Sequence, residues 1–460
     1  MFHEILNHLS SWNELDTWIV VTAALLGMAC ALPGVFLLLR RQSMVGDALS
    51  HTTLPGIVLA FLLAHGLKNS GFIAPQTYAA VWLTAVFVGA IVLSLLTALL
   101  SELVQSLGRV ESSAALGVVY TALFALGLLL IRLFASQVHL DADCVLYGSI
   151  ESSVAGRRGE TPLVVYTSGA ILAFNAVLLV IFFKELRIST FDPGLATAQG
   201  ISARAMHLGL MAVTAGTLVM AFESVGSILV IAMLIVPAAT ARMLCDRLWP
   251  TIAVSLMVAC LSALLGHVMA MFVPPMVFSR LGYPAVGRGG TAGLMAVAAG
   301  GLLVAALVFA PRQGLLSRIL NRVWLGIKIA GEDWLGVLYR QEELPVPQRA
   351  GLTAELVAQS NSLGALITRL AVARLRWQGK VMARAEGYQL TDAGRQEGRQ
   401  LIRAHRLWET YLARHFPETA AHLHESAHVA EHFVSPVIEE QLAVELDRPQ
   451  QDPQGKQIPP

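Results

Sequence analysis

Asp47 and His51 stand four positions apart at the start of an apolar segment. On a helix, positions i and i+4 share one face, so this carboxylate and this imidazole can bind one cation together. Pro55 adds a third donor, because a proline inside a helix frees the carbonyl four residues earlier, here that of His51. The alternative is a helix cap followed by a kink. The cost of placing an ionisable group in a membrane span, about 2.5 to 3.5 kcal/mol, favours the cation site.

Histidines gather near the C-terminus, where six of the 13 in the chain fall between His405 and His432. His405 and Glu409 form an i,i+4 pair on one predicted helix. A second group lies at helical offsets further along the chain and consists of His424, His428, Glu431 and His432. Imidazole and carboxylate ligands suit Mn, Fe(II) or Zn and do not separate them. The alternative is a solvated polar helix face.

The elements that must position these residues are mostly membrane helices. The 460-residue chain is 55% hydrophobic and 14% charged, with a mean hydropathy of +0.62. Its apolar stretches are too long for one soluble core. Windows of about 20 apolar residues predict nine spans, the second of them short and broken at Pro55 and Gly56, and eight or ten spans stay as alternatives. The predicted spans are 17–39, 54–67, 78–100, 114–134, 162–183, 204–222, 226–244, 249–273 and 291–310.

Basic residues in the loops predict the orientation of these spans. Most of them fall on alternate loops, which places those loops in the cytoplasm, the N-terminus outside and the C-terminus inside. They are Arg40, Arg41, Arg109, Lys184, Arg187, Arg204, Arg242, Arg247 and Arg312. Arg157, Arg158 and Arg280 lie on predicted outer loops and oppose this majority. After Pro311 the chain becomes charged and Arg-rich, which indicates a cytoplasmic domain.

Three motifs in the membrane half resemble the permease subunits of zinc, manganese and iron ABC importers. They are Gly46–Gly56, Phe191–Ile201 and Val225–Ala241, and the resemblance covers about residues 15–311. It implies that Asp47 and His51 coordinate metal in the translocation path. It also implies that Asp192, Pro193 and Gly200 belong to a cytoplasmic coupling helix that contacts an ATP-binding subunit. An Asp-Pro pair is by itself a good helix start.

The resemblance implies partners for the chain. No Walker A motif occurs in the sequence, so ATP hydrolysis is expected on a separate ATP-binding cassette subunit and the chain itself is not expected to be an enzyme. An extracytoplasmic metal-binding protein and a second permease chain complete the expected assembly. The expected cargo is divalent Mn, Fe or Zn, and no organic cofactor is expected. The four cysteines form no CxxC pair, so they indicate neither a disulfide framework nor a thiolate site.

The tail resembles the iron- and manganese-dependent repressors, a family of winged-helix metalloregulators. The matching motifs are Glu332–Leu335, Ala373–Leu375, Gly379–Val381, Tyr388–Gly394, His405–Glu409, His428, Glu431–His432 and Asp452–Gly455. The resemblance implies one metal site made of Asp333, His428, Glu431 and His432. It implies a neighbouring site made of His405, Glu409 and His424. Gly336 stands where manganese-selective members have a second acidic ligand, and His428 where iron-selective members often have Cys, so the metal stays open.

The expected recognition helix of this tail comprises residues 363–377. Its composition differs from that of a helix that reads DNA. It is apolar where small polar residues should reach phosphates and base edges. Arg369, Arg374 and Arg376 are the candidate phosphate contacts, and DNA binding therefore stays open.

The sequence thus predicts an all-α polytopic membrane protein with a mostly α winged-helix and metal-binding tail. The predicted parts are a permease domain at 1–311, an amphipathic linker at 312–330, a winged helix at 331–395, metal-binding and dimerisation helices at 396–447, and an extended tail at 448–460. The predicted function is metal import across the cell membrane with metal sensing by the tail. A membrane-tethered or proteolytically released repressor and a secondary cation carrier are the alternatives.

Overall fold

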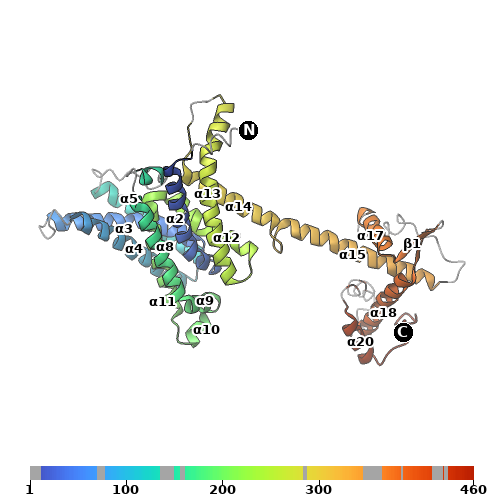
Figure 1. Ribbon diagram of the computed structural model, residues 1–460. Helices are drawn as coiled ribbons and strands as arrows, with labels where there is room; N and C mark the ends of the chain where they lie inside the picture. Colours follow the sequence, from blue (N-terminus) through green and yellow to red (C-terminus); the bar gives the residue numbers. More distant parts are fainter. Residues whose placement is uncertain are drawn as a thin grey trace. The chain divides into compact units, whose positions relative to one another are not determined.

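The computed structural model describes residues 12–69, 78–134, 150–155, 161–282, 287–344, 365–384, 387–416, 428, 432 and 434–460. The chain forms two compact units, Met1–Leu315 and Leu316–Pro460 (Figure 1).

The described residues of the first unit form helices joined by loops. They are α2 (Glu14–Leu39), α3 (Met44–Asn69), α4 (Tyr78–Gly108), α5 (Ser112–Phe134), α7 (Ile150–Val154), α8 (Leu163–Ile181), α9 (Phe183–Phe191), α10 (Pro193–Ala198), α11 (Ala203–Val225), α12 (Ser227–Leu244), α13 (Leu248–Arg280) and α14 (Thr291–Phe309). Nine stretches of these described helices are long and apolar enough to cross a membrane. The predicted polytopic, all-α membrane domain is confirmed.

Helix α2 is the centre of this unit and packs against α8, α11, α12 and α13. Its middle is buried on all sides, as expected for a helix that is apolar around its whole circumference. Asn175 of α8 fixes the packing, because its side-chain amide donates to the Ala29 carbonyl at 3.0 Å and to Thr217 Oγ1 at 2.9 Å. One buried amide therefore joins α2, α8 and α11.

The second span differs from the prediction, since α3 is one continuous helix from Met44 and is not broken at Pro55 and Gly56. Close packing explains why the helix tolerates both residues. A Cβ on Gly56 would lie 2.7 Å from the Gly89 carbonyl oxygen of α4, and a Cβ on Gly127 of α5 would lie 2.9 Å from Pro55 Cδ. Small residues that let helix backbones approach are typical of membrane helix pairs.

The second unit contains α15 (Leu315–Glu342), α17 (Ala365–Trp377), β1 (Val381–Arg384), β2 (Gly387–Leu390), α18 (Asp392–His415) and α20 (Pro436–Glu445). Strands β1 and β2 form an antiparallel hairpin, with Val381 opposite Leu390 and Arg384 opposite Gly387. Trp334 of α15 and Leu375 of α17 pack with this hairpin in one core. Helices followed by a hairpin agree with the expected winged helix.

Two segments of the tail differ from the prediction. Residues 315–330 are no separate linker, because α15 continues without interruption to Glu342. Residues 448–460 are not extended but fold back as a turn, in which Asp452 Oδ1 accepts from the amides of Gln454 and Lys456. Ile458 then packs with Leu407 of α18. The polar, proline-rich composition of this segment did not indicate that Ile458 would pack against α18.

Candidate metal centres

Helix α3 places Asp47 and His51 on one face, as predicted. The distance from His51 Nε2 to Asp47 Oδ1 is 3.5 Å, and both side chains are about 40% exposed, at 38% and 42%. Metal–ligand bonds of about 2.1 Å place neighbouring ligand atoms about 3 to 3.5 Å apart, so this pair fits one ion. Pro55 lies inside the helix and has no amide hydrogen to offer the His51 carbonyl, so that carbonyl as third ligand stays a prediction.

Two aromatic residues that the sequence analysis missed position His51. The Tyr120 ring stacks on the imidazole with centroids 5.9 Å apart, and the Phe124 ring meets it edge-on at 5.0 Å. Both come from α5, where their i,i+4 spacing puts them on one face. This i,i+4 spacing was the signal in the sequence that could have indicated a shared contact. The aromatic wall restricts the imidazole ring to orientations that leave Asp47 within reach.

The expected coupling segment is a pair of short helices, α9 and α10. Asp192 caps α10, because its Oδ1 accepts from the Leu195 amide at 2.9 Å, and Pro193 occupies the first turn. Gly200 ends the segment with φ at +80°, a conformation that favours glycine. The large apolar side chains of Phe191 and Leu195 are exposed. The segment is thus a rigid corner with an apolar surface.

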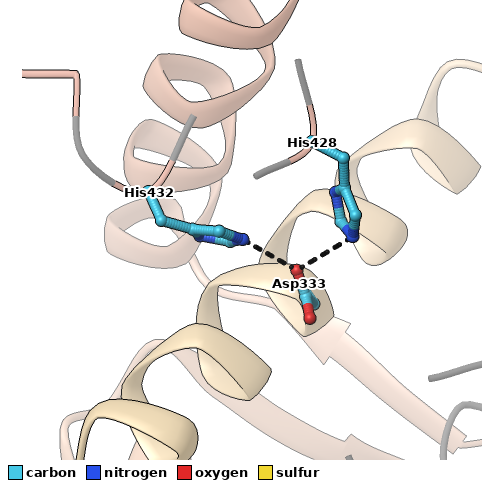
Figure 2. A group of neighbouring side chains, drawn as sticks. All are labelled: Asp333, His428 and His432. Atoms are coloured by element: carbon cyan, nitrogen blue, oxygen red, sulfur yellow. Dashed lines mark ion pairs between the residues drawn. The ribbon is translucent and has the colours of Figure 1, made fainter. Parts of the chain in front are cut away.

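Asp333, His428 and His432 form a candidate metal site in the tail, with one ligand atom from each lying within 4.8 Å of the others. Figure 2 shows both imidazoles directed at the Asp333 carboxylate of α15. The distance to Asp333 Oδ1 is 3.2 Å from His432 Nε2 and 3.6 Å from His428 Nε2. The side chains of His432 and Asp333 are 5% and 6% exposed, whereas that of His428 is 45% exposed. Two nitrogens and one carboxylate with an open side fit a first-row divalent cation.

Glu332 is a further candidate residue of this site, and the sequence analysis did not predict its contact with His432. Its Oε2 lies 2.8 Å from His432 Nδ1, so the imidazole lies between two successive carboxylates of α15. A carboxylate that accepts from one ring nitrogen of a histidine leaves the other nitrogen free to bind metal and holds the ring in place. The position of Glu332 directly before Asp333 was the only signal in the sequence.

The second predicted site is described in part. His405 and Glu409 are both buried in α18, with His405 Nε2 3.8 Å from Glu409 Oε2. Gln454 of the folded-back tail donates its Nε2 amide to Glu409 Oε1 at 2.8 Å, a contact that no local pattern predicts. His424 and Glu431, the remaining predicted ligands, lie outside the described residues.

The three candidate phosphate contacts all lie on α17. Arg369 and Arg376 are exposed, and the Arg374 guanidinium lies over the Trp324 ring of α15, 5.3 Å from its centroid. Residues 363 and 364, where the predicted recognition helix begins, lie outside the described residues. DNA contact by these arginines remains a prediction.

Comparisons with known proteins assign both units. Residues 13–276 match the ABC 3 transport family, and residues 391–460 match the iron dependent repressor, metal binding and dimerisation domain. The manganese transport system membrane protein MntD of Bacillus subtilis is 35% identical over 323 residues, which are 69% of this chain and 100% of that protein. The zinc transport system membrane protein TroD of Treponema pallidum is 38% identical over 306 residues, or 66% of this chain and 76% of that protein.

A solved structure supports the same assignment. PsaBC from Streptococcus pneumoniae in complex with Fab is similar to this chain with a TM-score of 0.51 and 27% identity, covering 68% of this chain and 98% of the solved chain. The predicted resemblances of the membrane half and of the tail are confirmed. The chain belongs to the ABC 3 transport family, as a membrane permease that carries an iron dependent repressor metal-binding and dimerisation domain at residues 391–460.

Proposed function

We propose that the chain is the permease subunit of an ATP-driven importer of Mn, Zn or Fe(II), and that its tail senses the same class of metal. The observation that carries the transport part is the Asp47 and His51 pair, 3.5 Å apart on an apolar helix of an ABC-family permease. Relatives that align along most or all of their length are named as manganese and zinc transport proteins. The pair is suited to transient binding, because two ligands hold an ion less firmly than a closed site.

The proposed cycle uses three parts of the chain. An extracytoplasmic binding protein delivers the ion to the outer side of the permease, where the N-terminus is also placed. The ion then passes Asp47 and His51 at the centre of a path completed by a second permease chain. An ATP-binding cassette subunit contacts α9 and α10 in the cytoplasm. Asp192, Pro193 and Gly200 make this corner stiff, so that motion of the ATPase reaches the spans on either side.

The tail supports metal sensing in the cytoplasm. Asp333, His428 and His432 bring an imidazole and carboxylate site together on a domain that carries a repressor-type metal-binding fold. A site of this kind fills as free cytoplasmic metal rises, and binding stabilises the folded tail. The metal-bound tail then signals to the permease unit that cytoplasmic metal is sufficient.

Reconstitution into proteoliposomes tests this function. The full chain with its ATPase subunit should take up manganese or zinc only with ATP, and His51→Ala should abolish that uptake. His65→Ala is the matched control, because His65 is an exposed histidine on the same helix. Uptake by the chain without an ATPase subunit would instead support a secondary carrier. Metal should also change the ATPase rate, and loss of His428 and His432 together should remove this response.

A further inference from the structure

Helix α17 exposes an apolar stripe where a DNA-reading helix exposes polar side chains. Leu366, Leu370 and Trp377 lie at helical offsets of four and seven and are 72%, 46% and 88% exposed. Ala373 fills the gap in the stripe and is also exposed. The opposite face of the helix is packed, since Val372 and Leu375 are buried in the core of the tail. The exposed stripe is therefore a second apolar face of α17, separate from the face that packs in the core of the tail.

Nucleic acid does not explain this stripe. Contacts with phosphates and base edges come from cationic and hydrogen-bonding side chains. An indole and two leucyl side chains along the centre of the exposed face offer few of these. A contiguous apolar surface with a polar rim instead marks contact with an apolar partner.

The charge around the stripe selects among apolar partners. Every ionisable side chain between residues 365 and 384 is basic: Arg369, Arg374, Arg376, Lys380 and Arg384. Lys380 is paired with Glu397 of α18, and Arg374 covers the Trp324 ring. Arg369 and Arg376 lie one position before Leu370 and Trp377, about 100° around the helix, so both cations border the apolar stripe on one side. Leucine and tryptophan bordered by arginine are typical of surfaces that bind the interface of an anionic bilayer.

The length of the chain between the last span and the tail limits how far this face can lie from a membrane. Span α14 ends at Phe309 and α15 begins at Leu315, so Trp324, the partner of Arg374, follows the last span by 15 residues and at most about 50 Å. The intervening helix is also suited to a membrane surface. It exposes Ile319 and Leu320, and residues 311–331 contain no acidic residue. A short tether raises the effective concentration of the bilayer surface at α17 without requiring a strong intrinsic affinity.

We propose that α17 is a membrane-contact surface of the tail, which binds anionic phospholipid. Leu366, Leu370 and Trp377 insert into the interfacial layer, and Arg369 and Arg376 bind lipid phosphates. This surface uses the helix that reads DNA in a winged-helix regulator for a different ligand. It is independent of which metal the permease carries.

Brominated lipids test this surface in the full chain. The emission of Trp377 is obtained as the difference between the wild type and Trp377→Phe in nanodiscs. This difference emission should fall at least twofold when phosphatidylglycerol is replaced by its brominated form, and much less in brominated phosphatidylcholine discs. Arg369→Gln with Arg376→Gln should weaken the quenching, and so should raised salt, because charge attraction is screened. Trp408, half-buried on α18, is the control, and its difference emission should not change.

Other results would contradict the proposed membrane contact. Trp377 emission that is unquenched in both brominated lipids, or equally quenched in both, excludes selective binding of anionic phospholipid. Salt-sensitive binding of duplex DNA that shields Trp377 from acrylamide would assign α17 to DNA instead. Wild-type thermal unfolding of the arginine variants shows that any loss of quenching is not a loss of fold.

Discussion

His432 Nε2 lies 3.2 Å from Asp333 Oδ1, which joins a residue near the C-terminus to the helix that begins the tail. Neither residue can complete the site from its own segment. A metal bound there therefore links α15 to the segment around residues 428–432. Occupancy by metal is consequently coupled to the folding of the tail, because the unfolded chain does not assemble these ligands.

Removing both histidines should remove this coupling. We expect Mn or Zn at one hundred times the dissociation constant to stabilise the wild-type tail by about 2.7 kcal/mol, and His428→Ala with His432→Ala to abolish most of this gain. Hydrogen exchange of α15 amides in the full chain measures it. His415→Ala is the control, since His415 is exposed and its contacts, with Glu445 and with the Tyr411 ring, lie outside the candidate site. An unchanged response in the double variant would show that these histidines do not bind the metal.

The transport pair should behave as one unit. Asp47→Ala and His51→Ala should each abolish metal uptake while the protein still inserts and assembles, because each removes one of two ligands and also removes an insertion cost. The double variant should transport no worse than either single one. Ser50→Ala tests position alone, since the Ser50 hydroxyl donates only to the Asp47 carbonyl at 2.7 Å. Near-normal uptake in both single variants would place the path elsewhere.

Local patterns in the sequence predicted local features of the structure. The span positions follow from bilayer thickness, and the Asp47 and His51 pair follows from helix periodicity, so both depend only on near neighbours. The approach of Asp333 to His428 and His432 was implied only by the family resemblance, and other contacts between distant segments were missed. Glu332 faces His432 across 100 residues, and Gln454 reaches Glu409 across 45 residues. No spacing rule reports such contacts, because the tertiary fold creates them.

The prediction that the second span is broken at Pro55 and Gly56 was wrong for a related reason. A proline followed by a glycine weakens an isolated helix, and the sequence alone offers no compensation. In the structure the compensation comes from α4 and α5, whose Gly89 and Gly127 receive Gly56 and Pro55. Helix packing therefore overrides the local propensity.

Gly56→Ala tests that packing. The new Cβ would lie 2.7 Å from the Gly89 carbonyl oxygen, so α3 and α4 must separate, at a cost of about 1 to 3 kcal/mol. We expect a lower melting temperature in detergent and reduced uptake, because α3 carries the transport pair. Gly66→Ala on the same helix meets nothing within 4 Å and should leave both unchanged. Equal melting temperatures of the two variants would contradict the close packing of α3 and α4.

The corner at α10 should control coupling to ATP hydrolysis. Asp192→Ala removes the cap that accepts from the Leu195 amide, a loss of about 1 kcal/mol at this helix end. Gly200→Val places a branched side chain at φ +80°. Both should lower uptake per ATP hydrolysed and leave metal binding unchanged. Gly194→Ala is the control, since its Cβ meets only Asp192 Oδ1 at an ordinary 3.4 Å. Coupled uptake in both variants would make this segment an ordinary loop.

Arg406 should be the residue on which the folded-back tail most depends. It is 3% exposed, it binds Glu343 through both Nη atoms at 3.0 and 2.6 Å, and its Nε lies 3.7 Å from the buried Asp452. It also donates to the Gln457 carbonyl. Arg406→Ala leaves the Asp452 carboxylate buried without its cation, which typically costs about 3 to 5 kcal/mol.

Hydrogen exchange of α18 amides in the full chain measures this loss. Asp452→Asn added to Arg406→Ala should recover part of the stability, because it removes the uncompensated charge. Arg399→Ala is the matched control on the same helix, since Arg399 donates only at the surface, to the Pro460 carbonyl, and should cost less than about 1 kcal/mol. Equal losses for Arg406→Ala and Arg399→Ala would mean that the buried ion pair does not hold the tail and that other contacts, such as Ile458 and Gln454, do so. A larger loss for Arg406→Ala, partly recovered in the double variant, would show that a buried ion pair holds residues 448–460 against α18.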